Sequence, residues 1–171
     1  MGWVKAQPIF NPMSFSPSQP LFLIETANLN DLGGMRTIEQ ACFPLDAWPL
    51  LELIGALTLP GLVRLKAVVD GKMVGFVVGM TKRARHEGWI TTLGVLPGYR
   101  RLGIASALLD ECEKAMGMPV IRLTVRRSNL GALHLYRLRG YSQVEVWEHY
   151  YEGGEDGLVL EKLSPEYLDK S

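Results

Sequence analysis

Residues 89–106 read WITTLGVLPGYRRLGIAS, and this stretch decides the fold. The apolar run from Trp89 to Val95 predicts a buried strand, which Pro97 and Gly98 bring to an end. A helical pattern begins after Gly103 and separates two kinds of side chain on opposite faces. The apolar face carries Ile104, Ala107 and Leu108, and the charged face carries Glu111 and Lys114. The chain therefore passes from a strand through a basic turn directly into a helix.

The turn between this strand and this helix is suited to binding an anion. The first N–H groups of a helix lack internal partners, and the helix dipole adds partial positive charge there. Gly103 lets the backbone approach a phosphate without a Cβ in the way, and Ala105 does nearly the same. Arg100 and Arg101 add positive charge. The spacing is neither that of a Walker loop nor that of a G-x-G-x-x-G fingerprint, and an ordinary helix start with two solvated arginines is the plain alternative.

Length and composition predict a single domain. The chain has 171 residues, of which 47% are hydrophobic and 21% charged, so it can bury a sizeable core. The 18 basic and 18 acidic side chains cancel, which gives no bulk electrostatic attraction to nucleic acid or to a membrane surface. We therefore expect no nucleic acid and no membrane among the partners.

The termini and the cysteines add three expectations. Residues 1–20 contain four prolines and several serines, which predicts a proline-rich tail ahead of a domain over residues 21–171. Cys42 and Cys112 lie in apolar helical patterns, which favours buried thiols over a disulfide, and the spacing of the cysteines and histidines suggests no metal site. Without a signal-like segment, we expect a cytoplasmic protein.

The remaining chain alternates strands and helices. Asp70–Gly71 lies between two apolar runs, which is a strong hairpin signal. Leu32, Met35, Ile38, Glu39 and Cys42 give the face of one helix. The predicted strands are 21–26, 62–69, 72–80, 89–95, 120–125, 141–147 and 158–163, the predicted helices are 32–42, 48–59, 103–116 and 129–138, and residues 81–88 are expected to form a charged loop. The order predicts a mixed α/β fold, with a central mixed β-sheet flanked by helices.

A second block of the sequence carries a family resemblance. Residues 123–129 read LTVRRSN, residues 132–136 read ALHLY, and residues 138–141 read LRGY. Together with R-x-x-G-x-A at 100–105, these segments resemble the acetyl-CoA-binding motifs of the GNAT superfamily of N-acetyltransferases, in the same order and spacing. The resemblance covers about half the chain. It implies a single GNAT-like domain and acetyl-CoA as the cofactor.

Further segments are similar to one subgroup of that superfamily. Residues 89–105, residues 149–157 and the Phe43–Pro44–Leu45 segment resemble protein N-α-acetyltransferase catalytic subunits, and bacterial ribosomal-protein alanine N-acetyltransferases share most of these features. The resemblance implies a peptide or protein N-terminus as the substrate, with an auxiliary subunit as an optional partner and an undefined oligomeric state. It implies that the substrate contacts Phe43, Pro44, Leu45, Trp89, Tyr150 and Tyr151.

The resemblance also assigns roles around the cofactor. Backbone groups of Leu93, Gly94 and Val95 would hold the pantetheine arm, and those of Arg101, Leu102, Gly103, Ile104, Ala105 and Ser106 the pyrophosphate. Asn129 would contact the cofactor arm, a role compatible with capping the next helix. Tyr136 would lie near the sulfur as the general acid, although its helical spacing alone would also suit a core tyrosine.

The general base is missing from the expected positions. Related enzymes often carry Glu or His at the position of Thr124, or Tyr or His at that of Trp89, and neither residue here can usefully accept a proton. A water relay ending at Asp46, His86 or Glu87 is one interpretation. Direct capture of a neutral α-amine is another, since the pKa of an α-amine is near ~8 and that of lysine near ~10.4.

Three other functions remain open. One keeps the chemistry but uses a small-molecule amine or a lysine side chain; a polyamine would call for an acidic pocket, to which Glu152, Glu155 and Asp156 could contribute. Another is a non-catalytic acyl-CoA-binding module, which the missing base motivates. A nucleic-acid-binding function rests only on short basic clusters, and the zero net charge disfavours it.

Overall fold

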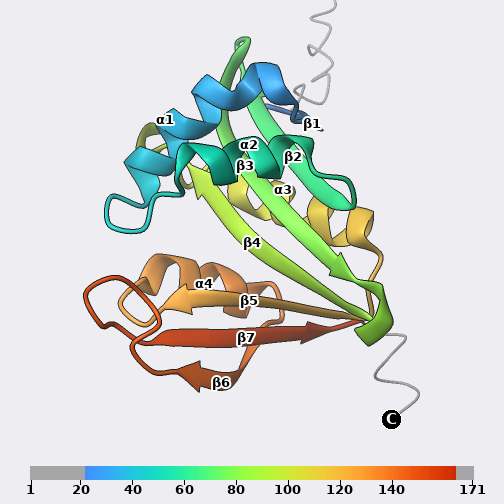
Figure 1. Ribbon diagram of the computed structural model, residues 1–171, viewed down its shortest axis with the longest axis vertical. Helices are drawn as coiled ribbons and strands as arrows, with labels where there is room; N and C mark the ends of the chain where they lie inside the picture. The colour runs from blue at the N-terminus through green and yellow to red at the C-terminus, as the bar shows by residue number, and fades with distance from the viewer. Residues whose placement is uncertain (1–21, 165–171) are drawn as a thin grey trace, which may run out of the picture.

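The computed structural model describes residues 22–164, so the expected tail of residues 1–20 lies outside it. Seven strands form one sheet in the order β1-β2-β3-β4-β5-β7-β6 (Figure 1). The strands are β1 (Leu23–Thr26), β2 (Leu62–Val69), β3 (Lys72–Lys82), β4 (Glu87–Val95), β5 (Val120–Arg126), β6 (Ser142–Trp147) and β7 (Gly157–Leu163). The helices are α1 (Leu32–Cys42), α2 (Leu50–Thr58), α3 (Ile104–Met116) and α4 (Leu130–Leu138). The predicted mixed α/β class is confirmed.

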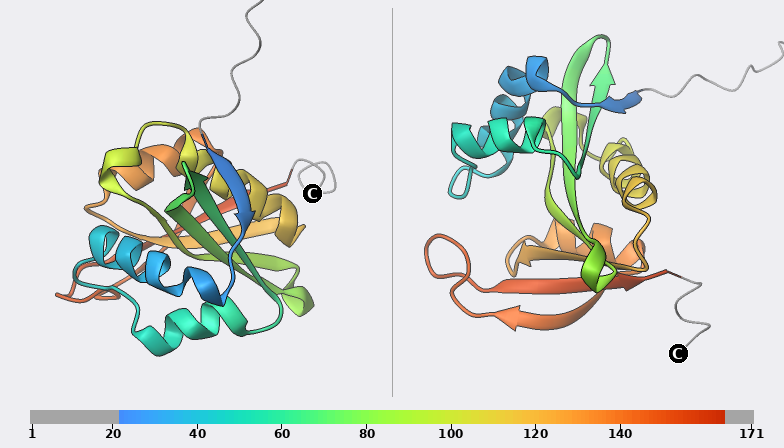
Figure 2. Two further views of the ribbon diagram at one scale, coloured as in Figure 1. Left: turned by 90° about the horizontal axis from the view of Figure 1, so that it is seen from above. Right: turned by 45° about the vertical axis from the view of Figure 1, so that its right-hand side comes forward.

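Two hydrophobic clusters hold the helices on opposite faces of the sheet (Figure 2). Under α1 and α2, Met35, Ile38 and Leu53 pack on Phe76 and Val78. The larger cluster lies under α3 and α4 and joins them to β3, β4, β5 and β7. The sheet is therefore the middle layer of three: α1 and α2 cover β2 to β4 on one face, and α3 and α4 cover the other face.

The predicted hairpin at Asp70–Gly71 is confirmed. Both residues have positive φ, 48° and 74°, as a two-residue turn between twisted strands requires. The predicted charged loop over 81–88 is mostly wrong, because β3 and β4 keep pairing through Thr81–Gly88 and Lys82–Glu87. Only a short turn of 3-10 helix and His86 separate the two strands. Cross-strand hydrogen bonds thus override the polar composition of this segment.

The parting of β4 from β5 positions the functional site. Every neighbouring pair of strands is antiparallel except β4 and β5, which are parallel and pair only from Glu87–Val120 to Ile90–Leu123. β3 pairs Val78 with Thr92 and Gly79 with Ile90, which leaves Thr91 as an extra residue in a bulge. Beyond that bulge β4 and β5 diverge, as Figure 1 shows.

Candidate active site

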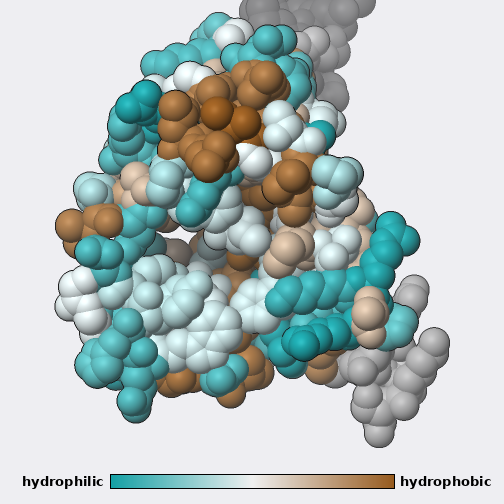
Figure 3. All heavy atoms as spheres, in the orientation of Figure 1, coloured by the Kyte–Doolittle hydropathy of each residue, from teal (hydrophilic) through white to brown (hydrophobic). Residues whose placement is uncertain are grey.

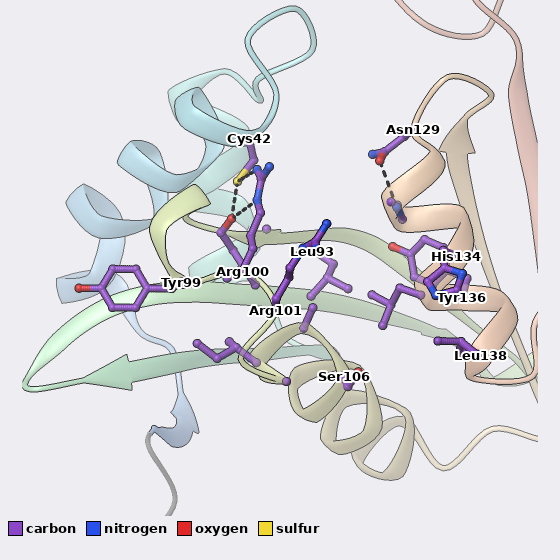
Figure 4. Close-up of a pocket in the computed structure, with 18 of the residues that line it drawn as sticks. Cys42, Leu93, Tyr99, Arg100, Arg101, Ser106, Asn129, His134, Tyr136 and Leu138 are labelled. Atoms are coloured by element: carbon purple, nitrogen blue, oxygen red, sulfur yellow. Dashed lines mark hydrogen bonds between the residues drawn. The ribbon is translucent and has the colours of Figure 1, made fainter.

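A large cleft of about 830 Å³ begins where β4 and β5 diverge. It runs from the β4–α3 turn to α4, as Figure 4 shows. Of the twelve residues predicted to contact the cofactor, all but Leu102 line it; the side chain of Leu102 is exposed. The lining residues that were predicted are Leu93, Gly94, Val95, Arg100, Arg101, Gly103, Ile104, Ala105, Ser106, Asn129 and Tyr136. Sequence reasoning did not name Cys42, Tyr99, Gly131, Ala132, His134, Leu135 and Leu138 as cleft residues.

The turn before α3 presents backbone N–H groups to this cleft. Arg101 and Gly103 both have left-handed backbones, with φ of 64° and 80°. Such a turn directs successive N–H groups to one side, and no side chain caps the start of α3. Since the first backbone hydrogen bond of α3 runs from Ala107 N to Gly103 O, the N–H groups of the first turn stay available. The local geometry fits an anion, and Gly103 supplies the φ that a side chain would strain.

Arg100 makes side-chain contacts that the sequence did not predict. Its Nε donates to the carbonyl of Val95 at 3.1 Å, and its Nη2 contacts the Sγ of Cys42 at 3.8 Å. The thiol of Cys42 donates to the same carbonyl at 3.3 Å. Arg100 therefore ties the end of β4 to α1 (Figure 4), and the exposed Arg101 is the arginine left with an unengaged side chain in this turn.

Tyr136 projects from α4 into the large cleft. Its side chain is only 7% exposed, and Figure 4 shows the phenol oxygen directed toward the β4 side. Burial raises the pKa of this phenol above its ordinary value of 10.0, so the group keeps its proton at neutral pH. Asn129 caps α4 by accepting from Ala132 N at 3.1 Å, and it lines the cleft as well.

A second, small cleft of about 140 Å³ adjoins the first on the α1–α2 side of the sheet. Five residues line both clefts: Phe43, Leu93, Asn129, Ala132 and Tyr136. The small cleft is further lined by Glu39, Asp46, Trp48, Ile90, Thr91, Thr92, Leu123, Thr124, Val125, Arg126 and Tyr151. Figure 3 shows the surface hollowed between the α1–α2 half and the half that holds β5 to β7. The two clefts therefore meet where the strands part, beside Tyr136.

The predicted substrate residues are only partly brought together. Phe43 and Tyr151 line the small cleft, whereas Pro44, Leu45, Trp89 and Tyr150 line neither. The side chain of Leu45 is 68% exposed. The rings of Trp89 and Trp147 are stacked, with their centroids 5.8 Å apart. The ring centroid of Tyr150 lies 5.1 Å from that of Trp147 and 5.0 Å from that of Tyr151. Trp89 and Tyr150 thus belong to an aromatic row that supports the side of the cleft carrying Tyr151.

A cluster of charges closes one side of the small cleft. Arg126 on β5 makes a bidentate contact with Asp46 at 2.7 and 2.8 Å and pairs with Glu155 at 2.7 Å. It also donates to the carbonyl of Glu152 at 2.9 Å, and Tyr151 lies under its guanidinium at 4.7 Å. We call Asp46, Arg126 and Glu155 the clamp, because they join the α1–α2 loop to the β6–β7 hairpin.

The structure argues against the three side chains that were predicted to end a water relay. Asp46 has its carboxylate committed to Arg126, so it is poorly placed to receive a proton. His86 and Glu87 lie at the start of β4 and line neither cleft, and Glu87 pairs with Arg122 at 3.1 Å. None of the three is therefore a suitable end point for the relay.

Sequence reasoning missed the one buried carboxylate in the small cleft. Glu39 is 1% exposed; its Oε1 accepts from the Thr92 hydroxyl at 3.0 Å and its Oε2 from Trp48 N at 3.4 Å. Burial raises the pKa of this carboxyl above its ordinary value near 4.5. The signal was present, since Glu39 lies on the apolar face of α1 between Met35 and Cys42.

Two other kinds of feature are absent from residues 22–164. That part of the chain holds no group of three His, Cys, Asp or Glu side chains able to bind a metal ion. Each of its helices is too short or too polar to cross a bilayer.

The split sheet, the turn with available backbone N–H groups and the buried tyrosine are together the features expected of an enzyme that binds a long phosphate-bearing cofactor on one side and an acceptor on the other. A family model described as the acetyltransferase (GNAT) family matches residues 34–141. The chain belongs to this family and is an acetyl-CoA-dependent acyltransferase, as the two motifs predicted.

Individual relatives are similar over most of the chain. The N-alpha-acetyltransferase of Sulfurisphaera tokodaii is 31% identical over 153 residues, which cover 81% of this chain and 91% of that protein. NAA10 of Arabidopsis thaliana, the N-terminal acetyltransferase A complex catalytic subunit, is 32% identical over 146 residues, covering 81% of this chain and 76% of that protein. Among solved structures, the ribosomal-protein-S18-alanine N-acetyltransferase from Escherichia coli has a TM-score of 0.73 and 26% identity, covering 83% of this chain and 93% of that chain.

Proposed function

We propose that this enzyme transfers the acetyl group of acetyl-CoA to the free α-amino group of a peptide or protein N-terminus, by direct attack within a ternary complex. The observation that carries the proposal is the meeting of two clefts of unequal size beside Tyr136. The large cleft has room for a long cofactor. The small one, at about 140 Å³, is far smaller. It suits the first residue of an extended chain.

The assignment of the large cleft to acetyl-CoA rests on its backbone groups. The N–H groups from Arg101 to Ser106 would bind the pyrophosphate. The edge of β4 from Leu93 to Val95 has no strand partner on the β5 side and would hydrogen-bond the pantetheine arm. Tyr136 would protonate the departing thiolate, since its phenol keeps its proton at neutral pH.

The acceptor assignment is supported by the ion pairing of the surface carboxylates. A polyamine site would need several carboxylates free to bind amines, yet Asp46 and Glu155 both pair with Arg126, and Asp156 pairs with Arg127 at 2.9 Å. Phe43 and Tyr151 give the cleft apolar surface. This favours a single amine attached to a short, weakly charged side chain, because burying an unpaired charge is costly. Both relatives described above by sequence carry N-terminal acetyltransferase names.

The test is acetyl-CoA turnover, followed as free thiol, across peptides that differ only at their first two residues. The panel includes an N-terminally blocked lysine peptide and a polyamine. Turnover confined to free N-termini is expected. Turnover on the blocked lysine peptide or the polyamine alone would refute the α-amine assignment. Acetyl-CoA binding without turnover of any amine would instead support a non-catalytic binding module.

The same assay tests whether the enzyme needs an auxiliary subunit. The Arabidopsis relative is named as the catalytic subunit of a complex. Turnover by the isolated chain would show that this enzyme acts without a second subunit. We also infer a cytoplasmic location, which the free thiols of Cys42 and Cys112 support. The division into a tail of residues 1–20 and a domain of residues 21–171 stays a prediction.

A further inference from the structure

Glu39 is a carboxylate buried without a cation. Within residues 22–164 no lysine, arginine or histidine lies within 4.0 Å of it. Its two partners, the Thr92 hydroxyl and the Trp48 N–H, are neutral. A purely structural role at this position would be filled as well by glutamine, which avoids the cost of burying a charge. A costly buried acid in a cleft is a candidate for chemistry.

The surroundings of Glu39 leave it free to exchange a proton. Glu52 on α2 is the acidic group that acts on it from the neighbouring helix, and its negative charge works in the same direction as burial. Asp46 and Arg126 share the small cleft but are paired with each other. The side that β3 turns toward α1 is apolar, with Phe76 and Val78. The hydroxyls that share the cleft with Glu39 are those of Tyr136, Tyr151, Thr91, Thr92 and Thr124.

Glu39 and Tyr136 stand on opposite sides of the opening in the sheet. Glu39 reaches the small cleft from α1, beside Thr92 on β4, and Thr92 directly precedes Leu93, which lines both clefts. Tyr136 reaches the same small cleft from α4, which follows β5. Their environments favour a carboxyl that titrates closer to neutral pH and a phenol that stays protonated. Two groups with such different proton affinities are what acid and base roles require.

We propose that Glu39 is the proton acceptor of the acetyl transfer, in place of the glutamate that related enzymes often carry at the position of Thr124. This inference rests on the function proposed above. Glu39 takes one proton from the α-ammonium, and the freed lone pair forms the C–N bond at the thioester carbonyl carbon. When the C–S bond breaks, sulfur keeps the electron pair and takes the phenol proton of Tyr136. The second proton lost by nitrogen returns to Tyr136, and the proton on Glu39 passes to solvent. One amide, one thiol and one released proton result.

The test is the variant Glu39→Gln, assayed against pH with a peptide that the wild type acetylates. Glutamine can accept from Trp48 N and donate to a rotated Thr92 hydroxyl, so both contacts survive. We expect kcat/KM for the peptide to fall about 10²-fold or more near neutral pH. The loss should shrink at high pH, where the amine is already neutral. The KM for acetyl-CoA should stay unchanged. The matched control is Glu111→Gln, an exposed residue of α3 that should behave as wild type.

Thermal unfolding distinguishes loss of the proton acceptor from loss of the folded structure in Glu39→Gln. Burial raises the pKa of Glu39, so the wild type loses stability as pH rises above the ordinary value near 4.5, and the variant does not. Glu39→Gln should therefore melt at or above the wild-type temperature at about pH 8, with a smaller difference at about pH 4. A folded variant with wild-type kcat/KM and an unchanged pH profile would overturn the inference while leaving the proposed function intact.

The choice of amine keeps the two proposals distinguishable. If the wild type acetylates only a lysine side chain or a small amine, the proposed function fails, and Glu39→Gln is assayed on that amine. The same loss is expected there, because every ammonium must release a proton before it attacks. If the wild type acetylates no amine at all, both proposals are overturned.

Discussion

Asp46→Asn should weaken acceptor binding and leave cofactor binding intact. The two side chains of the Asp46–Arg126 pair are 24% and 17% exposed, so water screens the pair only partly. The asparagine oxygen can still accept from Arg126, but the second of the two contacts at 2.7 and 2.8 Å is lost. A hydrogen bond to a charged group contributes about 1.5–3 kcal/mol. Partial exposure to water lowers this value, so losing one of the two contacts should cost about 1–2 kcal/mol.

That free energy holds the α1–α2 loop against the β6–β7 hairpin over the small cleft. The substitution destabilises the contact between this loop and this hairpin, so the KM for the peptide should rise about 5- to 30-fold, since each 1.4 kcal/mol is tenfold. The KM for acetyl-CoA should not move, because Asp46 lies outside the large cleft. Steady-state kinetics with each substrate varied in turn, the other saturating, measures both.

A control on the same hairpin is Asp156→Asn. Asp156 pairs with Arg127, whose side chain is 59% exposed, and such pairs contribute about 0–1 kcal/mol. Little change in either KM is expected. The clamp hypothesis is refuted if Asp46→Asn raises both KM values alike, or if a double-mutant cycle of Asp46→Ala with Arg126→Ala gives a coupling energy near zero.

Other predictions concern the acid, two glycines and the hairpin. Tyr136→Phe should lower kcat about 10²- to 10⁴-fold without changing acetyl-CoA affinity measured by calorimetry; a smaller loss would assign the acid role elsewhere. Gly33→Ala, at a helical position with nothing within 4 Å of an added Cβ, should raise Tm by about 1–4 °C. Gly94→Ala should lower Tm by about 2–12 °C in the same melting experiment, since its Cβ would lie 3.0 Å from Ile38; equal shifts for both glycines would contradict this. Hydrogen bonding to Ser128 is the main cause of the lowered pKa of Glu155, so the β6–β7 hairpin should lose stability as pH falls below about 4.5. Tryptophan fluorescence should report this loss in the wild type and show no such change in Glu155→Gln.

The features that the sequence predicted well are local. The R-x-x-G-x-A turn, the hairpin at Asp70–Gly71 and the cap at Asn129 each depend on residues within a few positions of one another. Backbone conformation there is set by glycine, by turn chemistry and by the start of a helix. The same holds for the large cleft, because both of its sides come from strand–turn–helix units that can be recognised in the sequence.

The features that the sequence missed join distant segments. Arg126 could be read from the sequence only as part of the LTVRRSN segment, because its partners Asp46 and Glu155 lie 80 and 29 residues away. Glu39 was visible on the face of its helix, yet only the packing of α1 on β4 brings it to Thr92, 53 residues on. Trp89 was assigned to the substrate, whereas its stacking on Trp147 depends on the order of strands. Helical and strand periodicity gives the face of an element and not its neighbour.

The gap between β4 and β5 is an opening through an otherwise continuous sheet, and it connects the two faces of that sheet. Under the proposed function, the nucleotide of acetyl-CoA and the body of the acceptor would lie on opposite sides of this gap, and only the acetyl group would pass between them. The elements that would choose the acceptor, the α1–α2 loop and the β6–β7 hairpin, can then vary without disturbing the turn that would grip the phosphates. Such a layout would let one cofactor-binding half serve different acceptors, with changes in specificity confined to the acceptor side.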